Sequence, residues 1–199
     1  RNIMKMMYHL TSISTTGSLK NAKLIEEVMP LGEWRFIPNG YDPEMFSYYS
    51  FKREPFLLTV GGVKPRKGAD IVIESLGLLK EEFPNLNYKI VGETESVPSF
   101  YSHLKDLIKK YGLEQRIEFL GRISDDQLRD LYNRCSVFVL SAQTREGAFE
   151  GFPMVFYEAQ AGGAPLISTR GFGSEYVIKD GYNGFLTDEN DIKGTAEAI

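Results

Sequence analysis

From residue 56 onward, short apolar runs alternate with segments in which apolar residues recur every three or four positions. The short runs predict strands and the amphipathic segments predict helices, so the pattern is typical of an α/β fold built on a parallel sheet. The expected strands are Phe56–Val60, Tyr88–Val91, Ile117–Leu120, Val137–Leu140, Pro165–Ser168 and Gly184–Leu186.

Apolar stripes mark two of the expected helices and are interpreted as core. One stripe consists of Ile71, Val72, Leu76 and Leu79, and the other of Phe100, Leu104, Leu107, Ile108 and Tyr111. Ser124 and Gln127 have the spacing of a capping box, which predicts a helix that starts there and buries Leu128, Leu131 and Tyr132. Gly162 and Gly163 are expected to end a further helix, which carries Glu158.

The segment before residue 56 differs from the rest of the chain. It predicts a helix near Ser18–Met29, a short strand at Arg35–Ile37 and a turn-rich exit at Pro38-Asn39-Gly40. Because the chain begins with Arg1 rather than Met and stops inside a predicted helix, we expect it to be a piece of a longer protein.

Length and charge narrow the class of protein. A chain of 199 residues with 42% hydrophobic residues can bury the core of one domain. Its net charge of -4 argues against nucleic acid as a partner, because phosphate-backbone binding needs a basic face. The single cysteine, Cys135, lies in an apolar stretch and predicts a buried thiol in a cytoplasmic protein. No apolar run is long enough for a membrane helix, although peripheral contact with a membrane stays open.

The predicted fold is a Rossmann-like, doubly wound parallel sheet with strand order 3-2-1-4-5-6. In such a sheet, ligands bind where the strand order reverses, at the carboxyl ends of the first and fourth strands. Those ends are followed by Gly61–Gly68 and Ser141–Phe152. The two segments with the most unusual composition therefore fall at one predicted crevice.

The second of these segments leads into two glutamates, Glu150 and Glu158, around a Gly-Phe-Pro turn. Pro153 is expected to open a helix, since proline is favoured in a first turn. Free N–H groups at a helix start suit a phosphate, and carboxylates on either side suit hydroxyls. The pattern predicts a site for a phosphorylated sugar or a nucleotide.

The first segment carries Arg66 and Lys67, which we expect to neutralise a diphosphate. Its spacing matches neither a P-loop nor Gly-x-Gly-x-x-Gly, so ATP hydrolysis and NAD binding lose support. The two histidines, His9 and His103, have no partner at metal-ligand spacing, and the sequence contains no Asp-x-Asp pair. We therefore expect neither a metal ion nor a cofactor.

The sequence resembles the retaining glycosyltransferases of family 4, specifically the C-terminal, donor-binding half of their GT-B architecture. The matching motifs, in order, are Ile37–Asp42 with Phe46, Val60-Gly61-Gly62, Arg66-Lys67-Gly68, Ile90-Val91-Gly92, Phe119-Leu120-Gly121, Glu150 to Ala159, and Asp180–Phe185. They cover roughly residues 35 to 199, and several motifs in the expected order make the resemblance specific.

The resemblance implies transfer of a hexosyl group from a UDP-, GDP- or ADP-linked sugar to an acceptor. It makes Glu150 the catalytic residue, in contact with hexose hydroxyls, and places Glu158 on the ribose and Lys67 on the diphosphate. The donor-binding residues that it implies are Gly62, Arg66, Lys67, Gly92, Arg122, Ile123, Gly151, Phe152, Pro153 and Glu158, with the base near Gly92, Arg122 and Ile123.

Two further expectations follow from the resemblance. Residues 1–34 are similar to the tail of an N-terminal domain, which would bind the acceptor, a glycan, a lipid or a small molecule, and residues 35–199 are similar to the domain that binds the nucleotide sugar. Because most of the N-terminal domain is missing, we expect this chain to bind the donor with little or no turnover. The family usually has an arginine at the position of Gly62, and we hypothesise that Arg66 replaces it.

Alternatives remain open at this point. A nucleotide-sugar epimerase can use the same architecture, but is not expected to have the Glu150 to Glu158 motif. A non-catalytic nucleotide-sugar-binding module is suggested only by the glycine at position 62, where the family usually has an arginine. A dehydrogenase is disfavoured because the glycine fingerprint is absent, although Glu93 follows the second strand as a ribose-binding acid would.

Overall fold

The computed structural model describes residues 13–18, 22–23, 26–27, 34–49, 52–145, 147–151 and 153–199. The helix expected near Ser18–Met29 lies largely outside these residues, although residues 22–23 and 26–27 are helical. Phe152, one of the expected donor-binding residues, also lies outside them.

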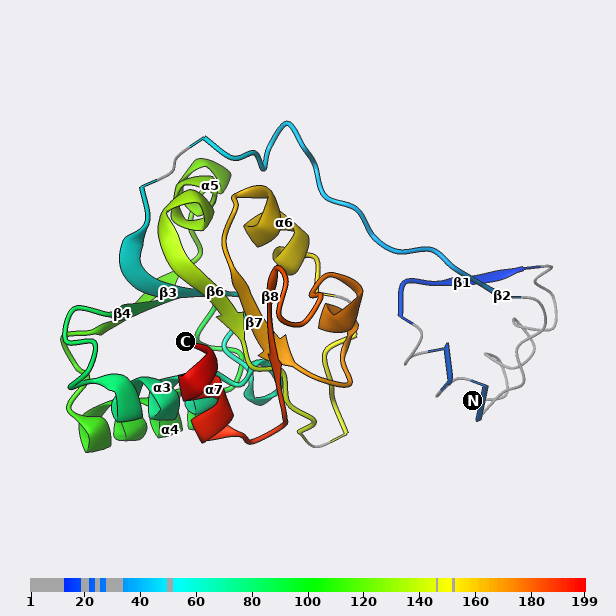
Figure 1. The fold of residues 1–199 in the computed structure, drawn as a ribbon. Coiled ribbons are helices and arrows are strands. Elements are labelled where there is room, and N and C mark those ends of the chain that lie inside the picture. The colour runs from blue at the N-terminus through cyan, green and yellow to red at the C-terminus, as the bar shows by residue number, and fades with distance from the viewer. Residues whose placement is uncertain are drawn as a thin grey trace.

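Six parallel strands form the central sheet (Figure 1). They are β3 (Glu54–Val60), β4 (Asn87–Val91), β5 (Ile117–Gly121), β6 (Cys135–Leu140), β7 (Leu166–Thr169) and β8 (Gly184–Thr187). Their order is β5-β4-β3-β6-β7-β8, which confirms the doubly wound order. Each strand begins and ends within two residues of its predicted bounds. The strand order reverses between β3 and β6, so the site is expected at their carboxyl ends.

Helices cover both faces of the sheet. They are η1 (Pro65–Lys67), α3 (Ala69–Leu79), α4 (Pro98–Tyr111), α5 (Asp125–Arg134), α6 (Val155–Ala161), η2 (Gly173–Tyr176) and α7 (Ile192–Ala198). In Figure 1, α3, α4 and α7 lie on one face, and α5 and α6 lie on the other. This two-sided cover explains why the strands read as continuous apolar runs.

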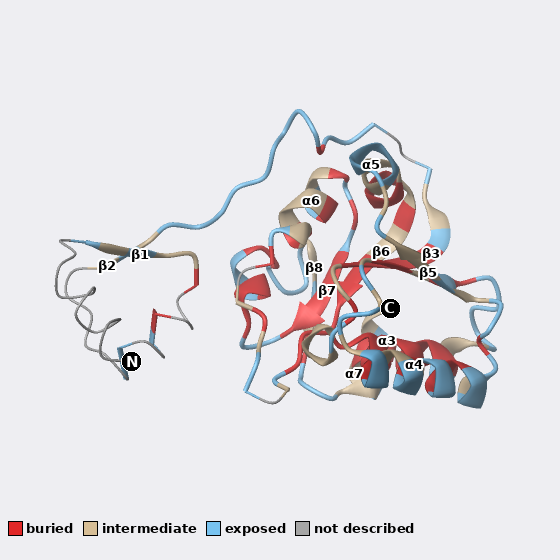
Figure 2. Ribbon diagram, turned by 180° about the vertical axis from the view of Figure 1, so that it is seen from behind, coloured by how far each residue is buried: buried red, intermediate tan, exposed pale blue. Residues whose placement is uncertain are grey.

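The core consists of two clusters, one on each face of the sheet. Successive strand residues point to opposite faces. Leu58 therefore packs with α5 and α6, whereas its neighbour Leu57 packs with α3 and α4, and both are fully buried. Figure 2 shows the resulting buried strands between half-exposed helices. The two predicted stripes are confirmed as the inward faces of α3 and α4, except that Leu79 and Tyr111 at the ends of these helices are only partly buried.

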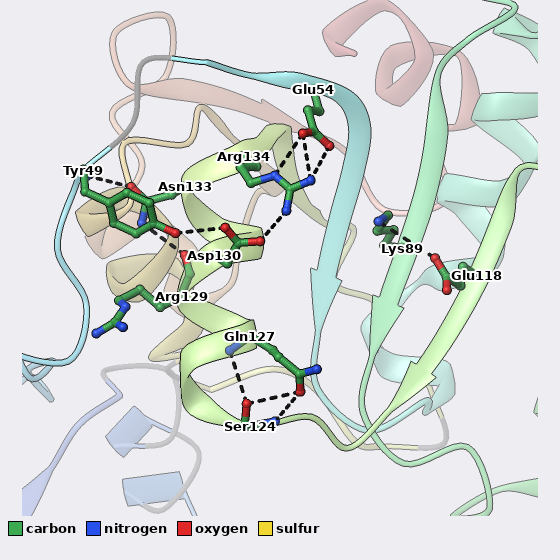
Figure 3. A network of polar contacts seen from close by, with 10 residues as sticks. All are labelled: Tyr49, Glu54, Lys89, Glu118, Ser124, Gln127, Arg129, Asp130, Asn133 and Arg134. Carbon is green, nitrogen blue, oxygen red and sulfur yellow. Dashed lines mark hydrogen bonds and ion pairs between the residues drawn. The ribbon is translucent and has the colours of Figure 1, made fainter.

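The helix α5 begins as its sequence predicted (Figure 3). The Ser124 hydroxyl accepts a hydrogen bond from the Gln127 N–H, and the Gln127 side-chain oxygen accepts one from the Ser124 N–H at 3.0 Å. This capping box satisfies two N–H groups that the first turn leaves free. Leu131 and Tyr132 on the inner face are buried, and Leu128 is partly buried.

The first part of the chain forms a small parallel sheet of its own. Strand β1 (Ser14–Thr16) pairs with β2 (Trp34–Phe36), and the Phe36 ring lies 5.0 Å from the ring of Tyr176 in η2. Residues 37–45 that follow are exposed, until Phe46 is buried in the main core. Arg35, where we expected the second domain to begin, thus lies inside β2, and the division at residues 34 and 35 stays a prediction.

Candidate functional site

The loops after β3 and β6 meet at the carboxyl edge of the sheet, as the topology predicted. Gly68 has a φ of 67°, and a Cβ added there would stand 1.7 Å from the carbonyl oxygen of Ser141. Only glycine permits this close approach of two backbones. A backbone hydrogen bond also joins the two loops, from the Gln143 N–H to the Arg66 carbonyl at 2.9 Å.

Arg66, Lys67 and Glu150 converge where these two loops meet. Lys67 Nζ lies 2.9 Å from Glu150 Oε2, and Arg66 Nη1 donates a hydrogen bond to the same oxygen. Glu150 is only 7% exposed, and the Lys67 side chain is only 12% exposed. Burial lowers the pKa of Lys67, while the charge of Glu150 counteracts this by raising it. Arg66 and Lys67 are therefore not merely solvated loop charges, because both form ion pairs with one buried carboxylate.

The loop after β4 packs against the loop after β3. Gly92 has a φ of 139°, and a Cβ there would stand 2.2 Å from the Gly61 carbonyl oxygen. The Gly61 N–H donates to the Val91 carbonyl, and the Val63 N–H donates to the Glu93 carbonyl, both at 2.8 Å. These bonds fix the backbone of the loop that carries Arg66 and Lys67.

Gly62 has room for a side chain. A Cβ at this position would meet Lys64 Cε at 3.7 Å and the Glu93 carbonyl oxygen at 3.9 Å, which are ordinary van der Waals contacts. Its φ lies outside the range that favours glycine. A larger side chain is therefore compatible with the local backbone.

The second glutamate of the motif, Glu158, lies in α6 and is half-buried. Its Oε2 accepts a hydrogen bond from the hydroxyl of Tyr132 at 2.8 Å. Burial raises the pKa of Glu158, whereas the Tyr132 hydrogen bond lowers it. Glu150 is thus paired with the loop after β3, and Glu158 is paired with α5.

The helix α6 begins later than expected. Pro153 is buried but does not open the helix, which begins two residues later, at Val155. The Pro153 carbonyl nevertheless accepts a hydrogen bond from the Phe156 N–H of the first helical turn, at 3.3 Å. Gly151 is half-buried beside Glu150.

The residues expected near the base lie after β4 and β5. The Gly92 N–H donates to the Gly121 carbonyl at 2.8 Å, which joins the two loops. Arg122 is 84% exposed in its side chain and lies 3.4 Å from the Glu93 carboxylate. Ile123 packs partly buried against the core. Arg122 and Ile123 therefore present one charged and one apolar side chain beside the loop of Gly92.

Sequence reasoning missed a set of contacts that hold the loop after β6. The Glu189 carboxylate accepts from the Thr144 N–H at 2.6 Å and from the Thr144 hydroxyl at 3.1 Å. The side-chain oxygen of the buried Gln143 accepts from the Asn190 N–H at 3.0 Å. These pairs span 45 and 47 residues, so no local spacing could have signalled them.

Other hollows lie away from these charges. One of about 410 Å³ lies between α6 and β8 and is lined mainly by backbone and apolar groups, including Leu166 and Phe185. Another of about 450 Å³ lies beside α5 and is lined largely by charged and polar residues, including Lys89, Glu118 and Asp130. We place the candidate site at Arg66, Lys67 and Glu150 instead, because these charges meet at the carboxyl ends of β3 and β6, where the strand order reverses.

Among the described residues, no helix combines the length and the apolar composition that a membrane span requires. No group of three or more histidine, cysteine, aspartate or glutamate side chains there is arranged to hold a metal ion.

Fold and site together define a doubly wound α/β domain with a ligand crevice at its topological switch point. The crevice offers cations for a phosphate and carboxylates for hydroxyls. The sequence model of the family "Glycosyl transferases group 1" matches residues 42–199, and the chain belongs to this family.

Individual relatives agree with this assignment. An uncharacterized glycosyltransferase of Methanocaldococcus jannaschii is 32% identical over 163 residues, which cover 82% of this chain and 42% of that protein. The GDP-mannose-dependent alpha-(1-6)-phosphatidylinositol monomannoside mannosyltransferase of Mycolicibacterium smegmatis is 27% identical over 183 residues, which cover 85% of this chain and 47% of that protein.

A solved structure has the same fold. HepE of Anabaena, crystallised with UDP and glucose, matches with a TM-score of 0.84 and 21% identity, over 98% of this chain and 55% of that chain. The chain thus spans about half the length of these relatives.

Proposed function

We propose that this chain is the donor-binding domain of a retaining, metal-independent glycosyltransferase of family 4. The whole protein would transfer a hexosyl group from a nucleoside-diphosphate sugar to an acceptor. The observation that carries the proposal is the convergence of Arg66 and Lys67 on Glu150 at the carboxyl ends of β3 and β6. Membership of the group 1 family supports the same class of reaction.

The ion pairs suggest how a donor enters. A diphosphate carries more negative charge than one carboxylate, so it can replace Glu150 as the partner of Arg66 and Lys67. Glu150 is then free to accept hydrogen bonds from the hexose hydroxyls, while backbone N–H groups near Gly151 approach the sugar. Glu158 accepts from the ribose hydroxyls.

The chemistry asked of these residues is mainly electrostatic. The bond from the anomeric carbon to the diphosphate breaks, a bond to the acceptor oxygen forms, and the acceptor proton leaves with the diphosphate. Arg66 and Lys67 stabilise the charge that grows on the leaving group, and Glu150 lies beside the cation-like sugar. Analysis of the products of the full-length protein separates transfer from epimerisation.

The rest of the proposal concerns the whole protein. The acceptor, a glycan, a lipid or a small molecule, would bind mainly to an N-terminal domain, and the protein would be cytoplasmic, with or without peripheral membrane contact. Cys135 is fully buried, and burial raises the pKa of its thiol to about 12, which keeps it unreactive.

Calorimetric titration of this chain with UDP, GDP and ADP, and then with their sugar conjugates, tests the proposal. The relatives' names include both UDP and GDP-mannose, so the screen covers more than one base. We expect one base to bind selectively and, at a hundred times its dissociation constant, to stabilise the fold by about 2.7 kcal/mol. Binding of none of the three would contradict donor binding by this domain.

Gly62→Arg is expected to tighten binding of the nucleoside diphosphate about tenfold. The backbone and the surrounding space accept a side chain at this position, and a guanidinium there adds a charge-assisted bond of about 1.5 kcal/mol to the diphosphate. Gly62→Gln, which adds a polar side chain without a charge, is the control in the same titration. Equal affinities for the two variants would exclude a diphosphate near Gly62.

A further inference from the structure

Tyr132 combines complete burial with a polar contact to Glu158, the second glutamate of the motif. The residue lies on the inner face of α5 and is 0% exposed. Its ring packs against the rings of Phe46 and Phe138, at centroid distances of 5.8 and 5.7 Å. Its hydroxyl donates a hydrogen bond to Glu158 Oε2 at 2.8 Å. Since a buried hydroxyl is costly without a partner, this bond fixes the direction in which the hydroxyl points.

The bond has a consequence for Glu158. A carboxylate rotates freely in water, and each of its two oxygens can accept hydrogen bonds. With Oε2 held by Tyr132, rotation of the carboxylate is restrained, which leaves Oε1 to accept a hydrogen bond from a ligand. Glu158 is half-buried rather than closed off, so such a ligand has access.

The helix that carries Tyr132 is itself anchored at its C-terminal end (Figure 3). Arg134 donates to both oxygens of Glu54 at the start of β3, at 2.7 and 2.8 Å. The Asn133 side-chain oxygen accepts from the Tyr49 N–H at 2.8 Å. These bonds tie the last turn of α5 to β3 and to the segment that precedes it. The position of Tyr132 is therefore supported by contacts other than its bond to Glu158.

We propose that Tyr132 is a positioning residue that orients the Glu158 carboxylate for recognition of the ribose hydroxyls of the donor. The inference rests on the proposed function, because it assumes a nucleoside diphosphate in the crevice. It predicts that the hydroxyl of Tyr132, which does not contact the ligand, determines how strongly the site discriminates ribose from deoxyribose.

The test compares each nucleoside diphosphate that binds wild type, from UDP, GDP and ADP, with its 2′,3′-dideoxy form. In wild type we expect the dideoxy form to bind about 30-fold more weakly, as is typical for loss of a hydrogen bond to a charged group. In Tyr132→Phe we expect the ribonucleotide to bind about tenfold more weakly and the dideoxy form to change less than twofold. The discrimination ratio then falls to about three.

Tyr88→Phe is the matched control. Tyr88 is also fully buried, and its hydroxyl lies 2.7 Å from Thr59 Oγ1 in the sheet. Loss of either hydroxyl should lower the melting temperature by a similar amount, about 2 to 4 °C, because each removes one buried hydrogen bond. Only Tyr132→Phe should change the discrimination ratio, which a general loss of stability would not do.

The dependence of ribonucleotide affinity on pH, measured toward low pH, gives a second readout. The Tyr132 hydrogen bond lowers the pKa of Glu158, so its removal lets the carboxylate take up a proton at a higher pH. A protonated carboxyl is a weaker acceptor, and ribonucleotide affinity in Tyr132→Phe should therefore begin to fall at a higher pH than in wild type.

The outcomes separate the inference from the function on which it rests. Failure of wild type to bind any of the three nucleoside diphosphates would overturn both. If wild type binds a nucleoside diphosphate, an unchanged discrimination ratio in Tyr132→Phe would overturn the positioning role alone. Equal binding of ribose and dideoxyribose forms by wild type would do the same, since Glu158 would then not recognise ribose.

Discussion

Gly68→Ala is expected to destabilise the domain by about 3 to 5 kcal/mol, a large part of the stability of a typical domain. Its φ of 67° costs an alanine roughly 1 to 2 kcal/mol, and the new methyl group would stand 1.7 Å from the Ser141 carbonyl oxygen. Backbone atoms cannot swing aside as a side chain does, so the loops after β3 and β6 must separate. Equilibrium unfolding in urea measures the loss.

Gly112→Ala is the matched control. Gly112 has nearly the same φ, 66°, at the end of α4, but nothing lies within 4 Å of the added Cβ. Gly112→Ala should therefore lose only the free energy of unfolding that the left-handed backbone conformation costs an alanine, about 1 to 2 kcal/mol. Equal shifts of the urea midpoint for the two variants would show that the close approach at Ser141 contributes nothing to the cost.

Lys67→Met is expected to weaken binding of the nucleoside diphosphate about 100-fold. Methionine keeps most of the buried aliphatic stem but removes the charge, and loss of one partner from a buried ionic contact costs about 2 to 5 kcal/mol. Arg66→Ala should cost less, about tenfold, because its side chain is more exposed, at 27%. Calorimetric titration of each variant with the nucleotide that binds wild type measures both effects.

Lys64→Met controls for the general charge of the loop. Lys64 lies three residues before Lys67 in the same loop, but is exposed. Its removal should change the affinity less than threefold, since solvent screens an exposed charge. A loss of similar size in Lys64→Met and Lys67→Met would mean that the loop attracts the ligand by net charge alone. The specific pairing of Lys67 with a diphosphate would then be wrong.

The strands, the helix stripes and the capping box could be predicted because each is a local pattern. An apolar run such as Val137–Leu140 reads as a buried strand without reference to its neighbours, and Ser124 with Gln127 specifies a helix start within four residues. Strand order follows from general rules on connections between parallel strands, so the crevice could be predicted as well.

The partners within the site could not be predicted in this way. Arg66 and Lys67 were expected on a ligand, and the structure pairs them with Glu150, which lies 84 residues after Arg66. Tyr132 was expected only as core, because its place on an apolar helix face says nothing about where its hydroxyl points. The contact of Gln143 with Asn190 spans 47 residues and left no mark in either local sequence.

The sequence by itself determined the α/β architecture, the edge of the sheet where the site lies and the residue types available there, since periodicity and motif spacing are properties of neighbouring residues. Only the tertiary structure decided that Glu150 neutralises two cations, that Gly68 abuts Ser141 and that Tyr132 restrains Glu158. Each of these contacts joins segments distant in the chain, and its geometry depends on how two faces of the sheet pack against their helices.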